Sequence, residues 1–256
     1  MIHPTAVIHP ETSLGANVSI GAYAVIGAQV SIGDGCSIGH HAVIEGPTTL
    51  GRDNRIYPHA CLGQDAQDLG HAAPNARLEI GSGNIVREFV TMHRASAKDQ
   101  RITRIGDNNL FMNYVHIAHD CVVGHHVVLA NGVTLAGHVS IGDHVNMGGL
   151  CAIHQFSRIG SYAMVGGGSI ITLDIPPFML AVGNRAKLYG INRVGLRRHG
   201  FSLDEINQLK QAYRLLFRGP HRFDDAQATL QAAGLDSPQV SHLLDFIRTT
   251  KRGITF

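Results

Sequence analysis

Apolar residues recur every six positions along most of the chain before residue 177, and most regularly between residues 105 and 176. In each repeat the apolar residue is usually followed by Gly or Ala, and a small residue stands four positions after it. The apolar residues of the regular stretch are Ile105, Phe111, Ile117, Val123, Leu129, Leu135, Ile141, Met147, Ile153, Ile159, Val165 and Ile171. A fixed period of six residues is typical of a parallel β-helix, so we predict a solenoid with coils of about eighteen residues.

The repeat also predicts which side chains point inward. Strand side chains alternate between faces, so the apolar residue and the small residue two positions before the next one share the inner face. The Gly or Ala is expected to form the corner, because glycine tolerates backbone angles that other residues avoid.

Two segments interrupt the repeat. It runs from the N-terminus to Leu62, breaks over residues 65–79, returns at Ile80 and breaks again over residues 95–104. Insertions in solenoid proteins form loops on one face, which is often the binding face. We therefore expect the 65–79 loop to contact a ligand or a neighbouring subunit.

The strand pattern ends near Pro176, because proline cannot donate to a strand ladder. Residues 181–195 are expected to form a linker, and a capping box at Ser202 opens a helical pattern. We predict three helices, over residues 202–219, 224–233 and 237–250. The sequence thus predicts an all-β parallel β-helix over residues 1–182 and an α-helical domain over residues 183–256 that covers the open edge of the last coil.

Charge is divided unevenly between these two parts. The whole chain carries a net charge of +2, but residues 1–182 hold 9 Lys/Arg and 13 Asp/Glu, whereas residues 183–256 hold 12 and 6. A basic end indicates either an acidic partner or phosphorylated ligand, or simply a solvated helical face. Nothing in the pattern indicates a nucleic-acid partner.

The cysteines and the N-terminus bear on the compartment. Four cysteines lack metal-binding or redox spacing, and three of them (Cys36, Cys121 and Cys151) occupy the small inward position of a repeat. Buried free thiols suit a reducing cytoplasm. The chain begins Met1-Ile2-His3-Pro4, which is not a signal segment. No apolar run approaches the roughly 20 residues of a membrane-spanning helix, so we expect a cytoplasmic protein without membrane insertion.

The candidates for chemistry lie inside the long repeat. They are His116, His119, Asp120, Gly137, His138 and His154. Residues eighteen apart lie one above the other on adjacent coils, so His119 is expected beneath Gly137, and Gly137 beneath Gln155. By the same arithmetic Asp120 lies beneath His138, and the whole group falls within about two coils.

Three interpretations of this group remain open. In the first, His119 is a general base and the Gly137 N–H binds a developing oxyanion, which describes acyl transfer without a covalent intermediate. In the second, three histidines ligate zinc as in the hexapeptide-repeat carbonic anhydrases, although no residues that would orient the imidazoles can be identified. In the third, the histidines are structural and fill an interface of a non-catalytic trimeric scaffold.

At these residues the sequence resembles the UDP-N-acetylglucosamine O-acyltransferases of lipid A biosynthesis. The resemblance covers nearly the whole chain, including both loops and the helical tail. The matching motifs are His116-Ile117-Ala118-His119-Asp120-Cys121, Leu135-Ala136-Gly137-His138-Val139, His154-Gln155-Phe156, Asp174-Ile175-Pro176-Pro177, Gly183-Asn184 and Gly195-Leu196-Arg197-Arg198-His199-Gly200-Phe201.

The resemblance implies a homotrimer of left-handed β-helices with sites between subunits. It implies transfer of a 3-hydroxyacyl chain from acyl carrier protein to the 3-position of the sugar nucleotide. It also implies that the enzyme needs no metal and no cofactor of its own, because phosphopantetheine on the carrier protein holds the acyl group. The basic C-terminal end would then meet the acidic carrier protein.

The resemblance also assigns residues. It implies that His119 is the general base and that the Gly137 N–H binds the oxyanion. Gly167 matches the position that limits acyl length, and having Gly there suggests a longer chain. The substrate-binding residues that it implies are Asp68, His116, Asp120, His138, His154, Gln155, Gly167, Asn192 and Arg198.

Three positions depart from the family pattern. Gly70 stands where the family has a ligand-contacting Lys, Val194 where it has Glu, and Arg185 where it has a pantetheine-side His. These changes cluster where the sugar nucleotide is read. An alternative acceptor, such as a 3-amino or other variant sugar nucleotide, is therefore kept as a hypothesis.

Overall fold

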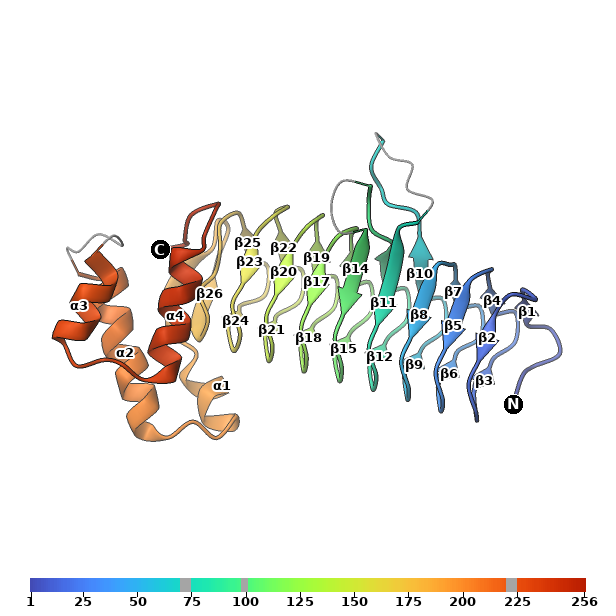
Figure 1. Ribbon diagram of the computed structural model, residues 1–256, viewed down its shortest axis with the longest axis horizontal. Helices are drawn as coiled ribbons and strands as arrows, with labels where there is room; N and C mark the ends of the chain where they lie inside the picture. The colour runs from blue at the N-terminus through green and yellow to red at the C-terminus, as the bar shows by residue number, and fades with distance from the viewer. Residues whose placement is uncertain (70–74, 98–100, 220–224) are drawn as a thin grey trace.

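The structure, a computed structural model, describes residues 1–69, 75–97, 101–219 and 225–256. Figure 1 shows a long prism of short strands with a group of helices at its C-terminal end. Three parallel sheets form the sides of the prism, which confirms the predicted parallel β-helix.

Successive strands pass from one sheet to the next in a fixed order. Sheet 1 contains β1 (Val7–Ile8), β4 (Val25–Ile26), β7 (Val43–Ile44), β10 (Cys61–Gln64), β13 (Thr91–His93), β16 (His116–Ile117), β19 (Thr134–Leu135), β22 (Ala152–Ile153) and β25 (Ile170–Ile171). Sheet 2 contains β2 (Ser13–Leu14), β5 (Val30–Ile32), β8 (Thr48–Leu50), β11 (Arg77–Ile80), β14 (Ile102–Ile105), β17 (Val122–Val123), β20 (Ser140–Ile141) and β23 (Arg158–Ile159).

Sheet 3 completes the prism. It contains β3 (Ser19–Ile20), β6 (Ser37–Ile38), β9 (Arg55–Ile56), β12 (Ile85–Val86), β15 (Leu110–Phe111), β18 (Val128–Leu129), β21 (Asn146–Met147), β24 (Met164–Val165), β26 (Met179–Val182) and β27 (Lys187–Ile191). We call the corner between sheets 1 and 2 the first edge, that between sheets 2 and 3 the second edge, and that between sheets 3 and 1 the third edge.

The core is the inside of the prism. The side chains of Ile117, Leu135 and Val115 are 0% exposed, as the two-residue alternation of strands predicts. Cys36, Cys121 and Cys151 are buried as free thiols, and burial raises the pKa of Cys121 to about 12. These sulfur atoms therefore behave as small apolar groups.

The prediction that Gly or Ala forms the corner through its backbone angles was wrong. The positive φ falls two residues later, mostly on non-glycine residues such as Tyr23 (φ 56), His138 (φ 62) and Tyr162 (φ 61). The Gly or Ala is required instead because the next coil lies very close. A Cβ on Gly33 would stand 2.7 Å from the carbonyl carbon of Gly51.

A buried asparagine ladder crosses three coils and was not predicted from the sequence. Asn54, Asn84 and Asn109 are 0–1% exposed. The Asn54 side-chain oxygen accepts from Asn84 N (2.9 Å), and the Asn84 side-chain oxygen accepts from Asn109 N (3.0 Å). The ladder satisfies backbone groups at the second edge, at the level of the two loops.

Both predicted interruptions are present. The chain leaves the prism between β10 and β11 and again between β13 and β14, and both excursions project on the same side (Figure 1). Residues 70–74 and 98–100 lie outside the described residues, and Gly70 is among them. Strand pairing has resumed by Ile102, two residues earlier than the predicted end of the second loop.

The C-terminal part contains α1 (Arg193–Arg198), α2 (Leu203–Phe217), α3 (Ala226–Ala232) and α4 (Pro238–Arg248). The capping box at the start of α2 is present, with Ser202 and Glu205 capping each other. The expected linker over residues 181–195 was wrong. It contains β27, which pairs antiparallel with β26, and the start of α1. The proposed domain boundary at residue 182 falls between these two paired strands.

The end of the chain returns to the last coil. Asp174 and Ile254 form a parallel bridge, and Arg158 donates to Asp174 Oδ2 (3.0 Å) and to the carbonyl of Phe246 (2.8 Å). The C-terminal segment therefore covers part of the exposed edge that the last coil would otherwise present. Among the described residues, none of the helices has the length and apolar character needed to span a membrane.

Candidate active site

The candidate histidines meet at the first edge, and the stacking predicted from the eighteen-residue coil is confirmed. His138 N donates to the carbonyl of His119 (3.0 Å), and Phe156 N donates to that of Gly137 (3.1 Å). The residues at the first edge of each coil therefore lie directly above their counterparts in the coil before. Gln155 takes the place above Gly137.

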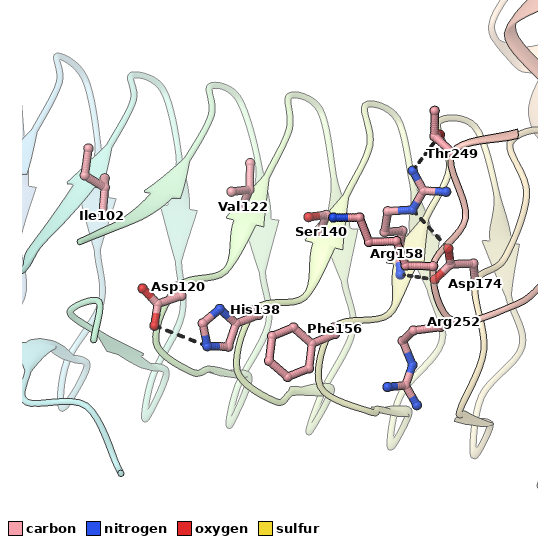
Figure 2. Close-up of a pocket in the computed structure, with 11 residues that line it drawn as sticks. Ile102, Asp120, Val122, His138, Ser140, Phe156, Arg158, Asp174, Thr249 and Arg252 are labelled. Atoms are coloured by element: carbon pink, nitrogen blue, oxygen red, sulfur yellow. Dashed lines mark hydrogen bonds and ion pairs between the residues drawn. The ribbon is translucent and has the colours of Figure 1, made fainter. Parts of the chain in front are cut away.

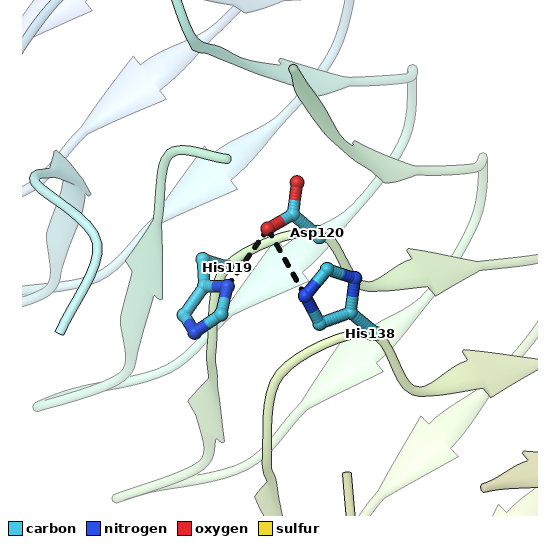
Figure 3. Close-up of side chains that lie close together, drawn as sticks. All are labelled: His119, Asp120 and His138. Atoms are coloured by element: carbon cyan, nitrogen blue, oxygen red, sulfur yellow. Dashed lines mark hydrogen bonds and ion pairs between the residues drawn. The ribbon is translucent and has the colours of Figure 1, made fainter. Parts of the chain in front are cut away.

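The His119 imidazole is oriented by a buried carboxylate (Figure 3). Its Nδ1 lies 2.8 Å from Asp120 Oδ2, and the Asp120 side chain is only 2% exposed. A carboxylate only accepts hydrogen bonds, so Nδ1 carries the proton and Nε2 keeps its lone pair. The pair thus presents a basic nitrogen from a side chain that is 14% exposed.

Asp120 is itself held by the second loop. Its carboxylate accepts from Ser96 N (3.0 Å to Oδ2), and its own N–H donates to Thr103 Oγ1 (2.9 Å). Burial alone would raise the pKa of Asp120, but hydrogen bonds from Ser96 and His119 outweigh it and lower that pKa. The carboxylate therefore stays ionised beside His119 near neutral pH.

Gly137 has no room for a side chain. A Cβ at this position would stand 2.6 Å from His119 Cε1 and 2.8 Å from Nε2. The imidazole therefore lies against the bare backbone of the coil above, and its basic nitrogen lies beside Gly137. This close approach explains why glycine occupies the position.

The Gly137 N–H is also uncapped, unlike its counterparts at the second edge. There, the N–H at the same repeat position donates to a side chain of the next coil: His125 N to Asp143 Oδ1 (2.8 Å) and Asp143 N to Ser161 Oγ (3.1 Å). Among the residues that the structure describes, none accepts a hydrogen bond from the Gly137 N–H. This donor is therefore available to another acceptor.

Two further histidines face this corner from sheet 1. His116 Nδ1 lies 2.8 Å from Thr91 Oγ1, and its ring meets that of His93 edge-on, with centroids 5.3 Å apart. His93 is 8% exposed, and its Nδ1 lies 2.6 Å from the carbonyl of Asp65 at the base of the first loop. Burial, followed by His93 and His119, lowers the pKa of His116 to about 4, so His116 is neutral at pH 7.

His138 completes the corner. Its ring is perpendicular to that of His119 (centroids 5.3 Å) and parallel to that of Phe156 (4.5 Å, 15°). Its Nε2 lies 3.6 Å from Asp120 Oδ2. Phe156 is 51% exposed, so its ring offers an apolar surface beside the polar side chains of His119, Asp120 and His138.

A groove of about 440 Å³ lies over sheet 2 next to these residues (Figure 2). It reaches Asp120 and His138 at one side and the C-terminal segment at the other. Its lining residues are Ile102, Asp120, Val122, His138, Ser140, Phe156, Arg158, Asp174, Thr249, Lys251 and Arg252. The groove therefore adjoins the candidate corner at Asp120 and His138, whereas His119 and Gly137 do not line it.

The other predicted residues lie elsewhere on this chain. His154 and Gln155 are exposed at the first edge one coil further on, whereas Gly167 lies at the third edge. Asn192 caps α1, accepting from Gly195 N (3.0 Å) and donating to the carbonyl of Tyr162 (2.9 Å). Arg198 is exposed at the end of α1. A single chain therefore does not bring Gly167, Asn192 or Arg198 to His119.

Asp68 lies in the described part of the first loop, where its N–H donates to the carbonyl of Ala66 (2.9 Å). Val194 is 63% exposed on α1 and Arg185 is exposed before β27. The structure thus places these three residues at the surface or partly buried, where a ligand or another chain can reach them.

Sequence reasoning missed four residues that support the site. Ser96 and Thr103 hold Asp120, and Thr91 and His93 hold His116. A signal for His93 was available, because it follows Met92 at the repeat position that Gly or Ala usually occupies. Thr91 and Thr103 lie in β13 and β14, one and two positions before the apolar residues Met92 and Ile105, whereas Ser96 comes from a loop, whose position the period does not determine.

Three of these side chains lie close enough together to hold a metal ion. One ligand atom each from His119, Asp120 and His138 lie within 4.8 Å of one another. However, Asp120 Oδ2 already lies within hydrogen-bonding distance of Ser96 N and His119 Nδ1. A metal ion on that oxygen would compete with both donors, so these residues fit a hydrogen-bonded dyad better than a ligand set.

The fold and this site define the class of the protein: it is a hexapeptide-repeat transferase built on a left-handed β-helix. A family model described as bacterial transferase hexapeptide (six repeats) matches residues 29–64 and 102–137. Another, described as UDP-N-acetylglucosamine O-acyltransferase, domain 2, matches residues 174–255.

Full-length relatives specify the family. A protein of Myxococcus xanthus named acyl-(acyl-carrier-protein)–UDP-N-acetylglucosamine O-acyltransferase is 49% identical, over 99% of this chain and 98% of its own. The solved structure of LpxA from Acinetobacter baumannii matches with a TM-score of 0.97 and 42% identity, covering 100% of this chain and 99% of that one. The solved structure of LpxA from Bacteroides fragilis matches with a TM-score of 0.98 and 38% identity, covering 100% of both chains. The chain belongs to the UDP-N-acetylglucosamine O-acyltransferase family.

Proposed function

We propose that this protein transfers a 3-hydroxyacyl chain from acyl carrier protein to the 3-hydroxyl of UDP-N-acetylglucosamine, the first step of lipid A biosynthesis. Family membership supports the reaction. The observation that carries it to this chain is the arrangement of Asp120, His119 and Gly137, which supplies an oriented base next to an uncapped N–H.

His119 is the general base of the proposed reaction. Its Nε2 takes the proton of the sugar hydroxyl as the hydroxyl oxygen bonds to the thioester carbonyl carbon. Asp120 keeps the proton on Nδ1 and stabilises the imidazolium that forms. General base catalysis of this kind contributes about 10²–10⁴-fold to the rate.

The Gly137 N–H binds the tetrahedral oxyanion of the proposed reaction. When the intermediate collapses, the carbon–sulfur bond breaks and the imidazolium of His119 returns its proton to the departing sulfur. The products are the ester and the free thiol of the carrier protein. His116 is neutral at pH 7, so it donates to or accepts from the substrate without adding charge, and His138 lines the same corner.

The substrate-binding assignments also belong to this proposal. Asp68 meets the sugar, His116, Asp120, His138 and His154 line the site, Gln155, Asn192 and Arg198 hold the nucleotide, and Gly167 limits the acyl chain. On one chain Gly167, Asn192 and Arg198 do not lie at the edge that carries His119. This separation supports a homotrimer in which neighbouring subunits complete each site.

The proposed donor arrives on the phosphopantetheine of acyl carrier protein, and the enzyme needs no cofactor or metal of its own. The excess of Lys and Arg after residue 183 supports an acidic partner at the C-terminal end. The buried thiols of Cys36, Cys121 and Cys151 support a cytoplasmic location.

The first experiment measures transfer from 3-hydroxyacyl carrier proteins of several lengths to UDP-N-acetylglucosamine, with EDTA present. Wild type should be active, and His119→Ala should lose about 10²–10⁴-fold in kcat. The matched control is His125→Ala, at the same repeat position on the second edge, which should retain activity. Full activity of His119→Ala would disprove the base assignment, and transfer that is lost in EDTA would contradict a reaction that needs no metal.

A second acceptor deserves a direct comparison because Val194 and Arg185 depart from the family pattern. A 3-amino analogue of the sugar nucleotide would yield an amide, which survives the mild base that cleaves an ester. Preference for this analogue would support the variant acceptor, whereas strict use of UDP-N-acetylglucosamine would exclude it.

A further inference from the structure

Four side chains stack along the second edge beside the C-terminal helices. His126, His144, Tyr162 and Phe178 occupy the positive-φ corner position of successive coils. Their ring centroids are 4.9, 4.7 and 5.8 Å apart in that order, with interplanar angles of 15° or less. We call these four residues the edge stack.

The short helix α1 is attached to the edge stack at both of its ends. At its N-terminus, Asn192 donates to the carbonyl of Tyr162 (2.9 Å). At its C-terminus, the ring of His199 lies 4.7 Å from that of His144 and 5.4 Å from that of Tyr162. Phe201 then packs edge-on against Tyr162 (5.0 Å). The position of α1 therefore depends on these ring contacts.

The surroundings of His144 favour its neutral imidazole. Burial, His199 and His126 lower the pKa of His144, with a smaller contribution from His125, whereas Asp143 acts in the opposite direction. His144 Nδ1 is buried and has no hydrogen-bond partner among the described residues. A proton on this nitrogen would be a buried donor without an acceptor, next to two other imidazoles.

We propose that His144 and His199 are positioning residues whose ring contact docks α1 on the edge stack, and that acidification, by protonating His144, releases the helix. Docking fixes the direction in which Arg197 and Arg198, in the last turn of α1, leave the helix. The effect on catalysis rests on the proposed function, in which Arg198 holds the nucleotide. The docking itself does not depend on that function.

The sign of the pH dependence follows from proton linkage. Because the pKa of His144 is lower in the docked state than its ordinary value of about 6.5, the docked state binds fewer protons than the released state. Docking is therefore fully favoured above about pH 6.5 and weakens as the pH falls below that value.

Hydrogen exchange on the full-length protein tests the docking without using activity. In wild type, protection of the amides from Leu196 to Phe201, corrected for intrinsic exchange, should fall at least several-fold between pH 7.5 and pH 5.8. The double variant His144→Phe/His199→Phe keeps the rings but cannot be protonated, so its protection should not change. The control is His59→Phe, which alters a stacked imidazole at the third edge and should behave as wild type.

Kinetics supplies the second measurement. The KM for the sugar nucleotide should rise in wild type as the pH falls from 7.5 to 6, and this rise should flatten in the double variant. The kcat at saturating sugar nucleotide should depend on pH in the same way in both proteins. Protection in wild type that does not change with pH, or a double variant that loses protection like wild type, would overturn the proposal. If wild type transfers no acyl chain, the proposed function fails while the exchange measurement still decides the docking.

Discussion

At the scale of residues, the site depends on which backbone and side-chain groups are left unpaired. Asp120 accepts a hydrogen bond from His119 Nδ1, so Nε2 is the ring nitrogen that keeps a lone pair. Gly137 offers an N–H because, unlike at the second edge, no side chain of the next described coil accepts it. A base and an oxyanion donor thus lie next to each other at the first edge.

Gly137→Ala tests the close approach of the two coils. The new methyl group would stand 2.6–2.8 Å from the His119 ring, so the ring must move away from its present position. We expect kcat to fall by about 10²-fold, since a misplacement of about 1 Å can have this effect. The same substitution in a His119→Ala background should cost less stability than in wild type, because the ring is absent. Equal costs in a double-mutant cycle of thermal stability would contradict this explanation.

Asp120→Asn tests the electrostatic role of the carboxylate. The amide oxygen can still accept from Nδ1, but it cannot stabilise an imidazolium, so kcat should fall by about 10-fold to 10⁴-fold. Wild-type stability should also decrease in acid. Because the pKa of folded Asp120 is lowered, its contribution is present above about pH 3.9 and is lost as the pH falls further. A variant whose acid unfolding curve equals that of wild type would contradict this pKa shift.

At the scale of elements, short strands are stable here because each is one layer of a long stack. Most strands contain two residues, and each pairs with the strand above and the strand below. The loops between β10 and β11 and between β13 and β14 disturb this stack, and the asparagine ladder lies at that level. The second loop supplies Ser96 to the site, and β14, which follows it, supplies Thr103, so stability and function meet in these coils.

Asn84→Ala tests the ladder. Its side chain donates to Asn54 Oδ1 (3.0 Å) and to the carbonyl of Gly106 (3.0 Å), and accepts from Asn109 N (3.0 Å). Removing it leaves buried polar groups without partners, which costs about 1–3 kcal/mol for each group. We expect the free energy of unfolding to fall by about 2–4 kcal/mol, measured with urea. Ser37→Ala, at an exposed strand position, should change it by less than about 0.5 kcal/mol.

At the scale of the whole molecule, the helical part is joined to the prism through side chains of the last coils. Arg158 of β23 links the buried Asp174, the carbonyl of Phe246 in α4 and the hydroxyl of Thr249. The guanidinium also lies over the Phe246 ring, 4.2 Å from its centroid. One side chain therefore couples β23 to α4 and to the C-terminal segment.

Arg158→Met tests this coupling. It leaves the Asp174 carboxylate, which is 1% exposed, without its cation, so we expect a loss of about 2–4 kcal/mol in stability. Amides of residues 246–255 should exchange faster than in wild type, whereas those near β16 should not change. Restoring wild-type stability by the second substitution Asp174→Asn would support the ion pair as the cause. Uniform loss of protection along the prism would instead indicate global destabilisation.

The sequence by itself determined the coil, the inward side chains and the stacking of His119 beneath Gly137. It could do so because a fixed period places every residue beneath the one that follows eighteen positions later, as long as no loop lies between them. It also indicated both loops and the capped helix at Ser202. The corner was assigned to the wrong residue, since close packing between coils and a positive φ both favour glycine and only the structure separates them.

Only the tertiary structure decided how the site is oriented and how α1 is attached. Ser96 reaches Asp120 across 24 residues, and Asn192 reaches Tyr162 across 30, both through segments that break the repeat. The length of such a segment does not determine where its side chains return to the prism. The tautomer of His119, the neutral state of His116 and the docking of α1 therefore follow from contacts that no period in the sequence encodes.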